Sequence, residues 1–286
     1  MIDHILVCPF NEKLLNKIRK KAIVINTNEF NIIHYLKKGM NNSNKLHAIK
    51  INTEKAISEI AFQEEWANVP LAIYSPELGE YKNILHQLKL IRKLNLRIFL
   101  LSQNEFNFIG LRILSSLNVC CGLYFTEESF NWDPINNLMH YAVYSNTKHA
   151  PIEPFAWVAS NYKPTEYTDY SFVYFNNPSK YLHINEKEQI ALTAEDLLNG
   201  NYIEEGISSL ENICENEKYI AFENSRYETM LQMNECSFCQ AFRICLSKFH
   251  ALGNKNETCK VFFLDFLDAA DFSYAKRNKG DQLWQL

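Results

Sequence analysis

Glycine is scarce in this chain: its 286 residues include only eight. Loops that cradle phosphate groups need two or three glycines close together, because backbone N–H groups must approach the ligand. No two glycines here are closer in sequence than Gly200 and Gly206. This excludes a glycine-rich dinucleotide fingerprint, a P-loop and the G-x-S-x-G turn that carries a hydrolase nucleophile. An H-E-x-x-H motif is absent as well, so no common catalytic motif indicates an enzyme.

The chain also lacks an excess of positive charge and long apolar runs. Lysine and arginine number 29 against 33 aspartates and glutamates, which gives a net charge of -4. Without a basic field, we expect no nucleic-acid partner. The longest stretches without a charged residue, 113–126 and 134–147, fall short of the ~20 apolar residues of a membrane span. Because the N-terminus has no signal-peptide pattern, we expect a cytoplasmic protein with no membrane partner.

The middle of the chain alternates between strand-like and helical patterns. Residues 69–74 and 96–101 are apolar runs typical of buried strands, and each is followed by apolar residues at helical spacing, over 84–91 and 106–117. A third apolar run covers 119–125. This order predicts βαβ units and a parallel sheet. With a strand over 22–25 and a helix over 30–36, the chain up to residue 175 is expected to hold five or six strands, fewer than the eight of a closed barrel.

A different pattern begins near Pro178. Residues 172–175 are strand-like, and 181–184 are expected to pair with 189–193 as a hairpin across a polar loop. A helical stretch is expected from about residue 208. Residues 261–277 predict a closing helix, with acids early and bases late, as the helix dipole favours.

Four of the eight cysteines fall after residue 235. They are Cys236, Cys239, Cys245 and Cys259, with the spacing C-x2-C-x5-C-x13-C. A tight C-x-x-C turn directs two thiolates to one point, and in a reducing compartment such a set favours a zinc or iron–sulfur site over disulfides. The alternative is four buried free thiols.

The other four cysteines are expected to be structural. Cys120 and Cys121 lie in an apolar run, so we expect both in the core. Cys8 and Cys214 have no partner at a useful spacing.

Two histidines are candidates for a functional role, and each also has a structural explanation. His250 lies five residues after Cys245 and could replace Cys259 as a ligand, but a surface histidine is favoured where a cysteine is available. His183 is expected to be a cross-strand polar residue of the hairpin. The adjacent acids at 195–196 and 204–205 are expected to be solvated, because neighbours in sequence do not face one another.

The cysteine pattern follows a predicted hairpin at 181–193 and an L-N-G-N-Y-I segment at 198–203. Together, over roughly residues 170–286, these features resemble the SPASM domain that follows the barrel in radical SAM peptide and protein maturases. In that family the cysteine-rich tail holds auxiliary [4Fe-4S] clusters. The resemblance implies that one [4Fe-4S] cluster, with zinc as the alternative, is held by Cys236, Cys239, Cys245 and Cys259.

Two departures limit what this resemblance implies. Full SPASM domains have a further cysteine where this chain has Phe249, and the hairpin cysteines of the first auxiliary cluster are absent, so one cluster is missing. The C-x3-C-x2-C motif near the first barrel strand is missing too. Three thiolates there would leave one iron open for S-adenosylmethionine. We therefore expect no S-adenosylmethionine binding or cleavage and no radical chemistry.

The resemblance then implies a pseudo-radical-SAM protein with an α/β fold. A shortened partial (βα) barrel-like body would cover residues 1–175, and a small cysteine-rich SPASM-like α+β domain would cover residues 176–286. Its role would be that of a non-catalytic accessory or scaffold protein in the maturation of a ribosomally made peptide or protein. The partner would be the precursor peptide or a peptide-modifying enzyme, and this carries over by fold-level analogy.

The aromatic stretch over residues 157–175 is a candidate surface for such a partner, because tyrosine and tryptophan are favoured at interfaces. Five or six strands leave an open sheet edge, where a peptide could add as a strand close to the hairpin at 181–193. The competing explanation is that 172–175 forms a central strand buried on both faces.

Two other functional classes stay open. C-x2-C-x5-C also ends certain iron–sulfur nucleases of the restriction-nuclease fold, which need an E-x-K on a strand so that carboxylates hold Mg²⁺ beside a lysine. The only E-x-K here, Glu80-Tyr81-Lys82, is expected to begin a helix. The third class is a plain zinc-stapled structural scaffold with no link to peptides.

Overall fold

The computed structural model describes residues 3–18, 20–39, 45–126, 131–231, 236–246 and 258–283. The strands found in these residues form one sheet with the order β7-β6-β5-β4-β3-β2-β1-β8-β9. Neighbouring strands run parallel at β1–β2, β1–β8, β2–β3, β3–β4 and β6–β7, and antiparallel at β8–β9. The fold is therefore α/β, as the sequence predicts. The strands are β1 (Ile5–Cys8), β2 (Ala22–Thr27), β3 (Lys45–Asn52), β4 (Leu71–Ser75), β5 (Leu96–Leu101), β6 (Cys121–Tyr124), β7 (Ile152–Glu153), β8 (Tyr181–Ile184) and β9 (Ile190–Ala191).

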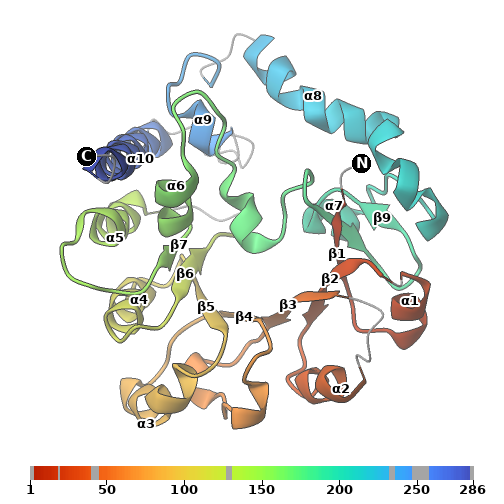
Figure 1. Ribbon diagram of the computed structural model, residues 1–286, viewed down its shortest axis with the longest axis horizontal. Coiled ribbons are helices and arrows are strands. Elements are labelled where there is room, and N and C mark those ends of the chain that lie inside the picture. Colours follow the sequence, from red (N-terminus) through yellow and green to blue (C-terminus); the bar gives the residue numbers. More distant parts are fainter. Residues whose placement is uncertain are drawn as a thin grey trace. The chain divides into compact units, whose positions relative to one another are not determined.

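Helices separate most of these strands (Figure 1). The α-helices are α1 (Glu12–Lys17), α2 (Ile32–Gly39), α3 (Tyr81–Ile91), α4 (Phe106–Ser116), α5 (Trp132–Tyr144), α6 (Phe155–Asn161), α7 (Ala194–Asn199), α8 (Glu217–Leu231), α9 (Phe242–Cys245) and α10 (Thr258–Leu283). Four 3-10 helices are η1 (Ile57–Glu59), η2 (Glu64–Trp66), η3 (Tyr170–Tyr174) and η4 (Ile207–Glu215). Of the helices in the described ranges, none is both long and apolar enough for a membrane span.

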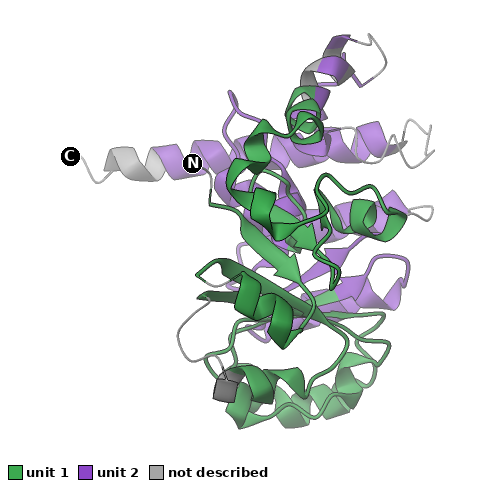
Figure 2. Cartoon of the chain, turned by 90° about the vertical axis from the view of Figure 1, so that its right-hand side faces the viewer, with its two compact units in different colours: residues 1–99, 174–224 green, residues 100–173, 225–286 purple. Residues whose placement is uncertain are grey.

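The chain divides into two compact units, coloured separately in Figure 2. Unit 1 comprises residues 1–99 and 174–224, and unit 2 comprises residues 100–173 and 225–286. Each unit is thus built from two separate stretches of chain. The sequence-based division into a body over 1–175 and a C-terminal domain over 176–286 stays a prediction.

In unit 1 the parallel strands β1 to β4 are joined by helical connections. The helices α1, α2 and α3 lie on the same side of these strands (Figure 1). Asn11 begins α1, because its side-chain oxygen accepts hydrogen bonds from the N–H groups of Lys13 and Leu14 at 3.0 and 3.2 Å. Ile23 and Val24, adjacent in β2, are both fully buried. Since successive side chains point to opposite faces, this strand is covered on both sides.

In unit 2 the long helix α10 packs against α5 and α6 through aromatic side chains. The ring of Trp132 stacks on Phe262 with centroids 4.9 Å apart. The ring of Phe155 meets Phe266 edge to face at 5.5 Å. The predicted closing helix over 261–277 is confirmed, and it extends further at both ends.

The alternation predicted for the middle of the chain is confirmed by β4, α3, β5, α4 and β6. The strand count was too low, because seven strands precede residue 175 within the described part of the chain. Three strands had no clear local pattern. β1 is a four-residue strand, β3 mixes polar and apolar residues, and β7 has only two residues.

The prediction of a strand over residues 172–175 is wrong, and so is the competing idea of a central buried strand there. Most of this stretch belongs to the 3-10 helix η3, and Phe175 has a positive φ of 57°. The chain then turns at Asn177, whose side-chain oxygen accepts a hydrogen bond from the N–H of Ser179 at 3.0 Å. A backbone that turns this sharply cannot continue as a strand.

The predicted hairpin is confirmed as β8 and β9, with Ile184 opposite Ile190. Its outer strand is covered by the chain itself. The N–H of Ile190 donates to the carbonyl of Glu204 at 2.8 Å, and the N–H of Ile203 donates back to the carbonyl of Ile190, also at 2.8 Å. Strand addition by a peptide at Ile190 is therefore blocked.

Candidate functional site

The first three cysteines of the predicted metal site lie on one short segment of unit 2. The N–H of Cys239 donates to the carbonyl of Cys236 at 3.1 Å, which closes the C-x-x-C turn. The N–H of Phe242 donates to the carbonyl of Cys239 at 3.0 Å, and α9 begins there. Cys245 is the last residue of α9, and Leu246 ends the helix in the left-handed conformation.

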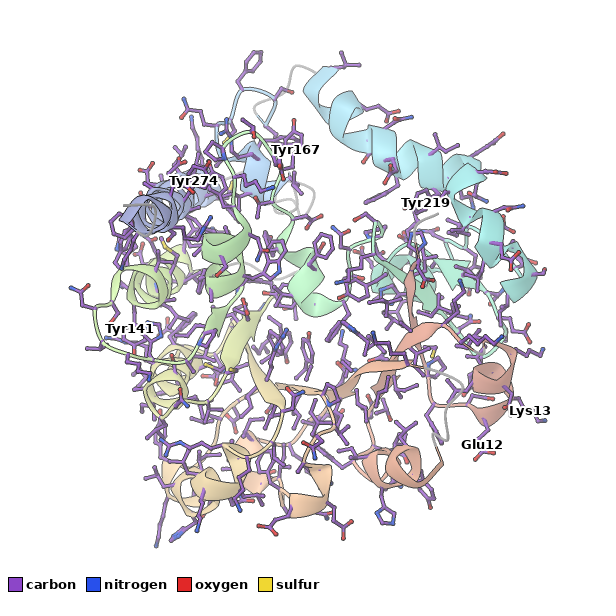
Figure 3. The ribbon with its side chains drawn as sticks, viewed as in Figure 1. Glu12, Lys13, Tyr141, Tyr167, Tyr219 and Tyr274 are labelled. Carbon is purple, nitrogen blue, oxygen red and sulfur yellow. The ribbon has the colours of Figure 1, made fainter. Side chains whose placement is uncertain are left out.

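The loop over residues 164–168 holds this segment in place. The guanidinium of Arg243 donates to the carbonyl of Pro164 at 2.8 Å, and the N–H of Thr168 donates to the carbonyl of Arg243 at 2.8 Å. The ring of Tyr167, labelled in Figure 3, meets Phe242 edge to face at 5.9 Å. The cysteine segment is thus anchored by both hydrogen bonds and aromatic packing.

The fourth cysteine, Cys259, is the second residue of α10, which contacts α9. All four thiols are half-buried and none forms a disulfide. Four thiols with this exposure have the donor chemistry that zinc and iron–sulfur clusters require. Among the residues that the structure describes, however, no three His, Cys, Asp or Glu side chains are gathered as a metal site needs. The convergence of the four cysteines stays a prediction, and Phe249 and His250 lie outside the described residues.

The remaining cysteines differ from one another in exposure. Cys8 is buried, and burial raises the pKa of its thiol to about 12. Cys121 is fully buried, which confirms its place in the core, and this burial raises the pKa of its thiol. Cys120 is exposed, so its predicted place in the core is wrong. Cys120 lies just before β6, whose first three residues are all buried.

We compared the chain with protein families, curated proteins and solved structures. No family model, curated protein or solved structure matches the chain. Function is therefore inferred from the chain's own residues and their geometry.

The E-x-K sequence that the nuclease alternative needs lies at the start of a helix, as predicted. Glu80 is the N-cap residue of α3, and Tyr81 and Lys82 are its first two residues. The N–H of Glu80 donates to the hydroxyl of Ser58 at 3.0 Å. A nuclease of this class needs the same sequence on a strand, so this segment gives that alternative no support.

Sequence reasoning missed two titratable residues on the strands of unit 1. Lys50 lies between two fully buried isoleucines in β3, and His183 lies between two fully buried residues in β8. His183 is a cross-strand residue of the hairpin, opposite Ala191, as predicted, and the structure adds that it is only 3% exposed. The available signal was a polar residue at the centre of an apolar strand, I-K-I for Lys50 and L-H-I for His183.

Burial changes the acid–base behaviour of both residues. It lowers the pKa of the half-buried Lys50 to about 8. It also lowers the pKa of His183 to about 3, and the positive charge of Lys50 acts in the same direction. At pH 7, Lys50 is therefore still mostly protonated while His183 is neutral. The Lys50 ammonium lies over the ring of Tyr74, with Nζ 4.6 Å from the ring centroid.

Proposed function

We propose that this chain is a non-catalytic accessory or scaffold protein in the maturation of a ribosomally made peptide or protein. The observation that carries the proposal is the strand order. From β1 to β7, each strand lies next to its neighbour in sequence without any reversal. A doubly wound sheet has a switch point where this order reverses, whereas a (βα) barrel has none. The order thus supports a partial (βα) barrel-like body, which is the architecture that the resemblance to radical SAM proteins implies.

The SPASM-like end is supported by the order of its elements. The hairpin β8–β9 is followed by α7, which ends at Gly200 with a φ of 75°, and later by the C-x-x-C turn before α9. We propose that Cys236, Cys239, Cys245 and Cys259 hold one [4Fe-4S] cluster, or alternatively zinc. Such a metal centre would link α9 to the start of α10, because both would supply ligands. It would also stabilise the fold, since structural metal binding contributes directly to folding.

The proposed partner is the precursor peptide or a peptide-modifying enzyme. Strand addition at Ile190 is blocked by Ile203 and Glu204. The aromatic stretch over 157–175 is helical at α6 and η3, where the rings of Trp157 and Phe172 stack at 5.5 Å. A partner that uses this stretch would therefore meet side chains on helices rather than an open strand edge.

Metal analysis after anaerobic purification tests the cysteine site. We expect a brown protein with iron and sulfide bound, or a colourless protein with about one zinc per chain. Cys259→Ser should lower the metal content at least severalfold and destabilise the protein. Cys214→Ser is the matched control, because Cys214 is exposed and lies in η4 of unit 1. A protein without metal, or equal metal content in both variants, would contradict the proposed site.

Pull-down with the products of neighbouring genes tests the partner. Retention of a precursor peptide or a modifying enzyme would support the maturation role. A metal-containing protein that retains neither would favour the plain zinc-stapled scaffold instead. Magnesium-dependent cleavage of DNA that is lost in Glu80→Gln would favour the nuclease.

A further inference from the structure

Lys50 and His183 lie on one face of the unit 1 sheet, as the strand registers show. His183 pairs with Val7, Val7 with Val24, and Val24 with Ala48. Residues paired side by side in parallel strands point to the same face, and Lys50 follows Ala48 by two positions. On this face, Val24 and Val7 occupy the two strands between the lysine and the histidine, and Asn26 lies beside the lysine.

Further polar residues lie near the carboxyl ends of the same strands. Asn26 in β2 pairs with Lys50, and Asn52 in β3 pairs with Tyr74 in β4. The side-chain amide of Asn52 donates to the side-chain oxygen of Asn26 at 2.8 Å, and this pair is exposed. Ligands of parallel α/β sheets bind at the carboxyl ends of the strands, so this group has the position of a binding site.

Lys50 has no counter-charge in the described part of the chain. None of the ion pairs found there includes it. Its pKa is lowered by burial, with no carboxylate acting against that effect. A half-buried ammonium without an anion is unfavourable, so a bound anion would stabilise this face.

His183 presents a hydrogen-bond acceptor with no donor. A hydrogen bond to the backbone of Phe175 raises the pKa of His183 against the larger effect of burial, so a ring N–H donates to that carbonyl. The other ring nitrogen, Nε2, is buried and has no hydrogen-bond partner. Because the ring is neutral at pH 7, Nε2 carries a lone pair that requires a donor.

A run of aromatic rings begins beside the lysine and makes this side of the face apolar. The ring of Tyr74, under the Lys50 ammonium, stacks on Phe99 with centroids 4.6 Å apart. The ring of Tyr174 meets Phe99 edge to face at 5.8 Å. In such surroundings a charged interaction is stronger than in water.

We propose that this face binds a carboxylate that carries an N–H or O–H donor beside its carboxyl group, as the C-terminal residue of a peptide does. The carboxylate pairs with the Lys50 ammonium, and the neighbouring donor bonds to Nε2 of His183. An apolar or aromatic side chain of the ligand packs near Tyr74 and Phe99. The proposal is independent of the metal site, because every residue that carries it lies in unit 1 and none is a cysteine.

Isothermal titration calorimetry with four small probes tests the ligand chemistry. N-acetylphenylalanine has both the carboxylate and the N–H, its amide lacks the charge, 3-phenylpropionate lacks the N–H, and inorganic phosphate lacks the side chain. We expect N-acetylphenylalanine to bind at least tenfold more tightly than each of the other three. No binding at millimolar concentration, equal binding of the amide, or a preference for phosphate would overturn the proposal.

Variants then assign the two contacts. Lys50→Met should weaken N-acetylphenylalanine at least tenfold, whereas Lys45→Met, an exposed lysine on the same strand, should leave it unchanged. His183→Phe should abolish the preference for N-acetylphenylalanine over 3-phenylpropionate. Unchanged affinity in folded Lys50→Met would overturn the proposal. If a variant fails to fold, as thermal unfolding would show, the probe series on the unaltered protein decides.

A peptide ending in phenylalanine identifies the source of the ligand. Tighter binding of the peptide with a free C-terminus than of its C-terminal amide would support recognition of a peptide end. Binding of N-acetylphenylalanine alone would support the same chemistry with a free small acid as the ligand. Neither binding experiment depends on the cysteines. Failure of the proposed metal site would be seen separately, in the metal content of the unaltered protein and of Cys259→Ser.

Discussion

At the scale of single residues, Gly79 shows how closely this chain packs around a turn. It has a φ of +75° and lies just before α3. The loop around it is tied to η1, because the N–H of Ser58 donates to the carbonyl of Leu78 at 2.9 Å. A Cβ atom at this position would clash with the hydroxyl of Ser58 and lie 2.8 Å from the Cβ of Ala56. Only glycine fits both the backbone conformation and the space.

We predict that Gly79→Ala lowers the free energy of unfolding by about 2–4 kcal/mol. Roughly 1 kcal/mol comes from the left-handed backbone, and the rest comes from the clash. Gly200→Ala is the matched control, because Gly200 has the same φ of +75° but its nearest neighbour is the Tyr202 hydroxyl at 4.0 Å. It should cost only about 1 kcal/mol. Urea unfolding measures the free energy of unfolding of both variants. Equal losses in the two would contradict the prediction, because the clash at position 79 would then contribute nothing.

At the scale of elements, the docking of α10 depends on a buried aromatic face. Phe262, Phe263 and Phe266 are each at most 3% exposed. The fully buried Ala269 and Ala270 extend this face along the helix. At the next turns, the guanidinium of Arg277 donates to the carbonyl of Tyr162 at 2.8 Å. Tyr274, labelled in Figure 3, meets the ring of Tyr162 at 6.5 Å.

We predict that Phe266→Ala destabilises the protein by about 3–5 kcal/mol, because it removes a large side chain from a packed site. Phe272→Ala on the same helix should cost only about 1 kcal/mol, since Phe272 is 48% exposed. Chemical denaturation followed by circular dichroism compares the two. A similar loss in both variants would mean that α10 is held by other contacts.

At the scale of the whole molecule, two of the four thiols outside the C-terminal set are buried and unsuited to bind an open iron, whereas Cys120 and Cys214 are exposed. Cys8 lies in β1 of unit 1, where burial raises its pKa to about 12. Cys121 lies in β6, where burial also raises its pKa. Metal ligation requires the thiolate, so these groups cannot easily replace the missing C-x3-C-x2-C motif.

We therefore predict that the anaerobically reconstituted and reduced protein does not cleave S-adenosylmethionine. The measurement is 5′-deoxyadenosine, which should not exceed the level of a control without protein. Production above that level, lost on substitution of Cys8 or of the pair Cys120 and Cys121, would contradict this prediction. It would also contradict the non-catalytic role proposed for the chain.

Local sequence patterns are sufficient to predict several of the elements. The apolar runs at 69–74 and 96–101 and the helical spacing after each predict β4, α3, β5 and α4, because periodicity acts within a few residues. The hairpin β8–β9 follows in the same way, since its strands are close in sequence. The cysteine spacing identified candidate ligands, and their convergence still awaits its test.

Contacts between segments far apart in the sequence follow from the fold alone. β8 lies parallel to β1, so that Tyr181 pairs with Ile5 across most of the chain. No local pattern contains that pairing, because it depends on how the intervening strands are ordered. The pairing places His183 on the face that also carries Lys50, where His183 is buried and Lys50 is half-buried between two buried isoleucines. Their shifted pKa values follow from this burial, which the sequence of either strand alone does not contain.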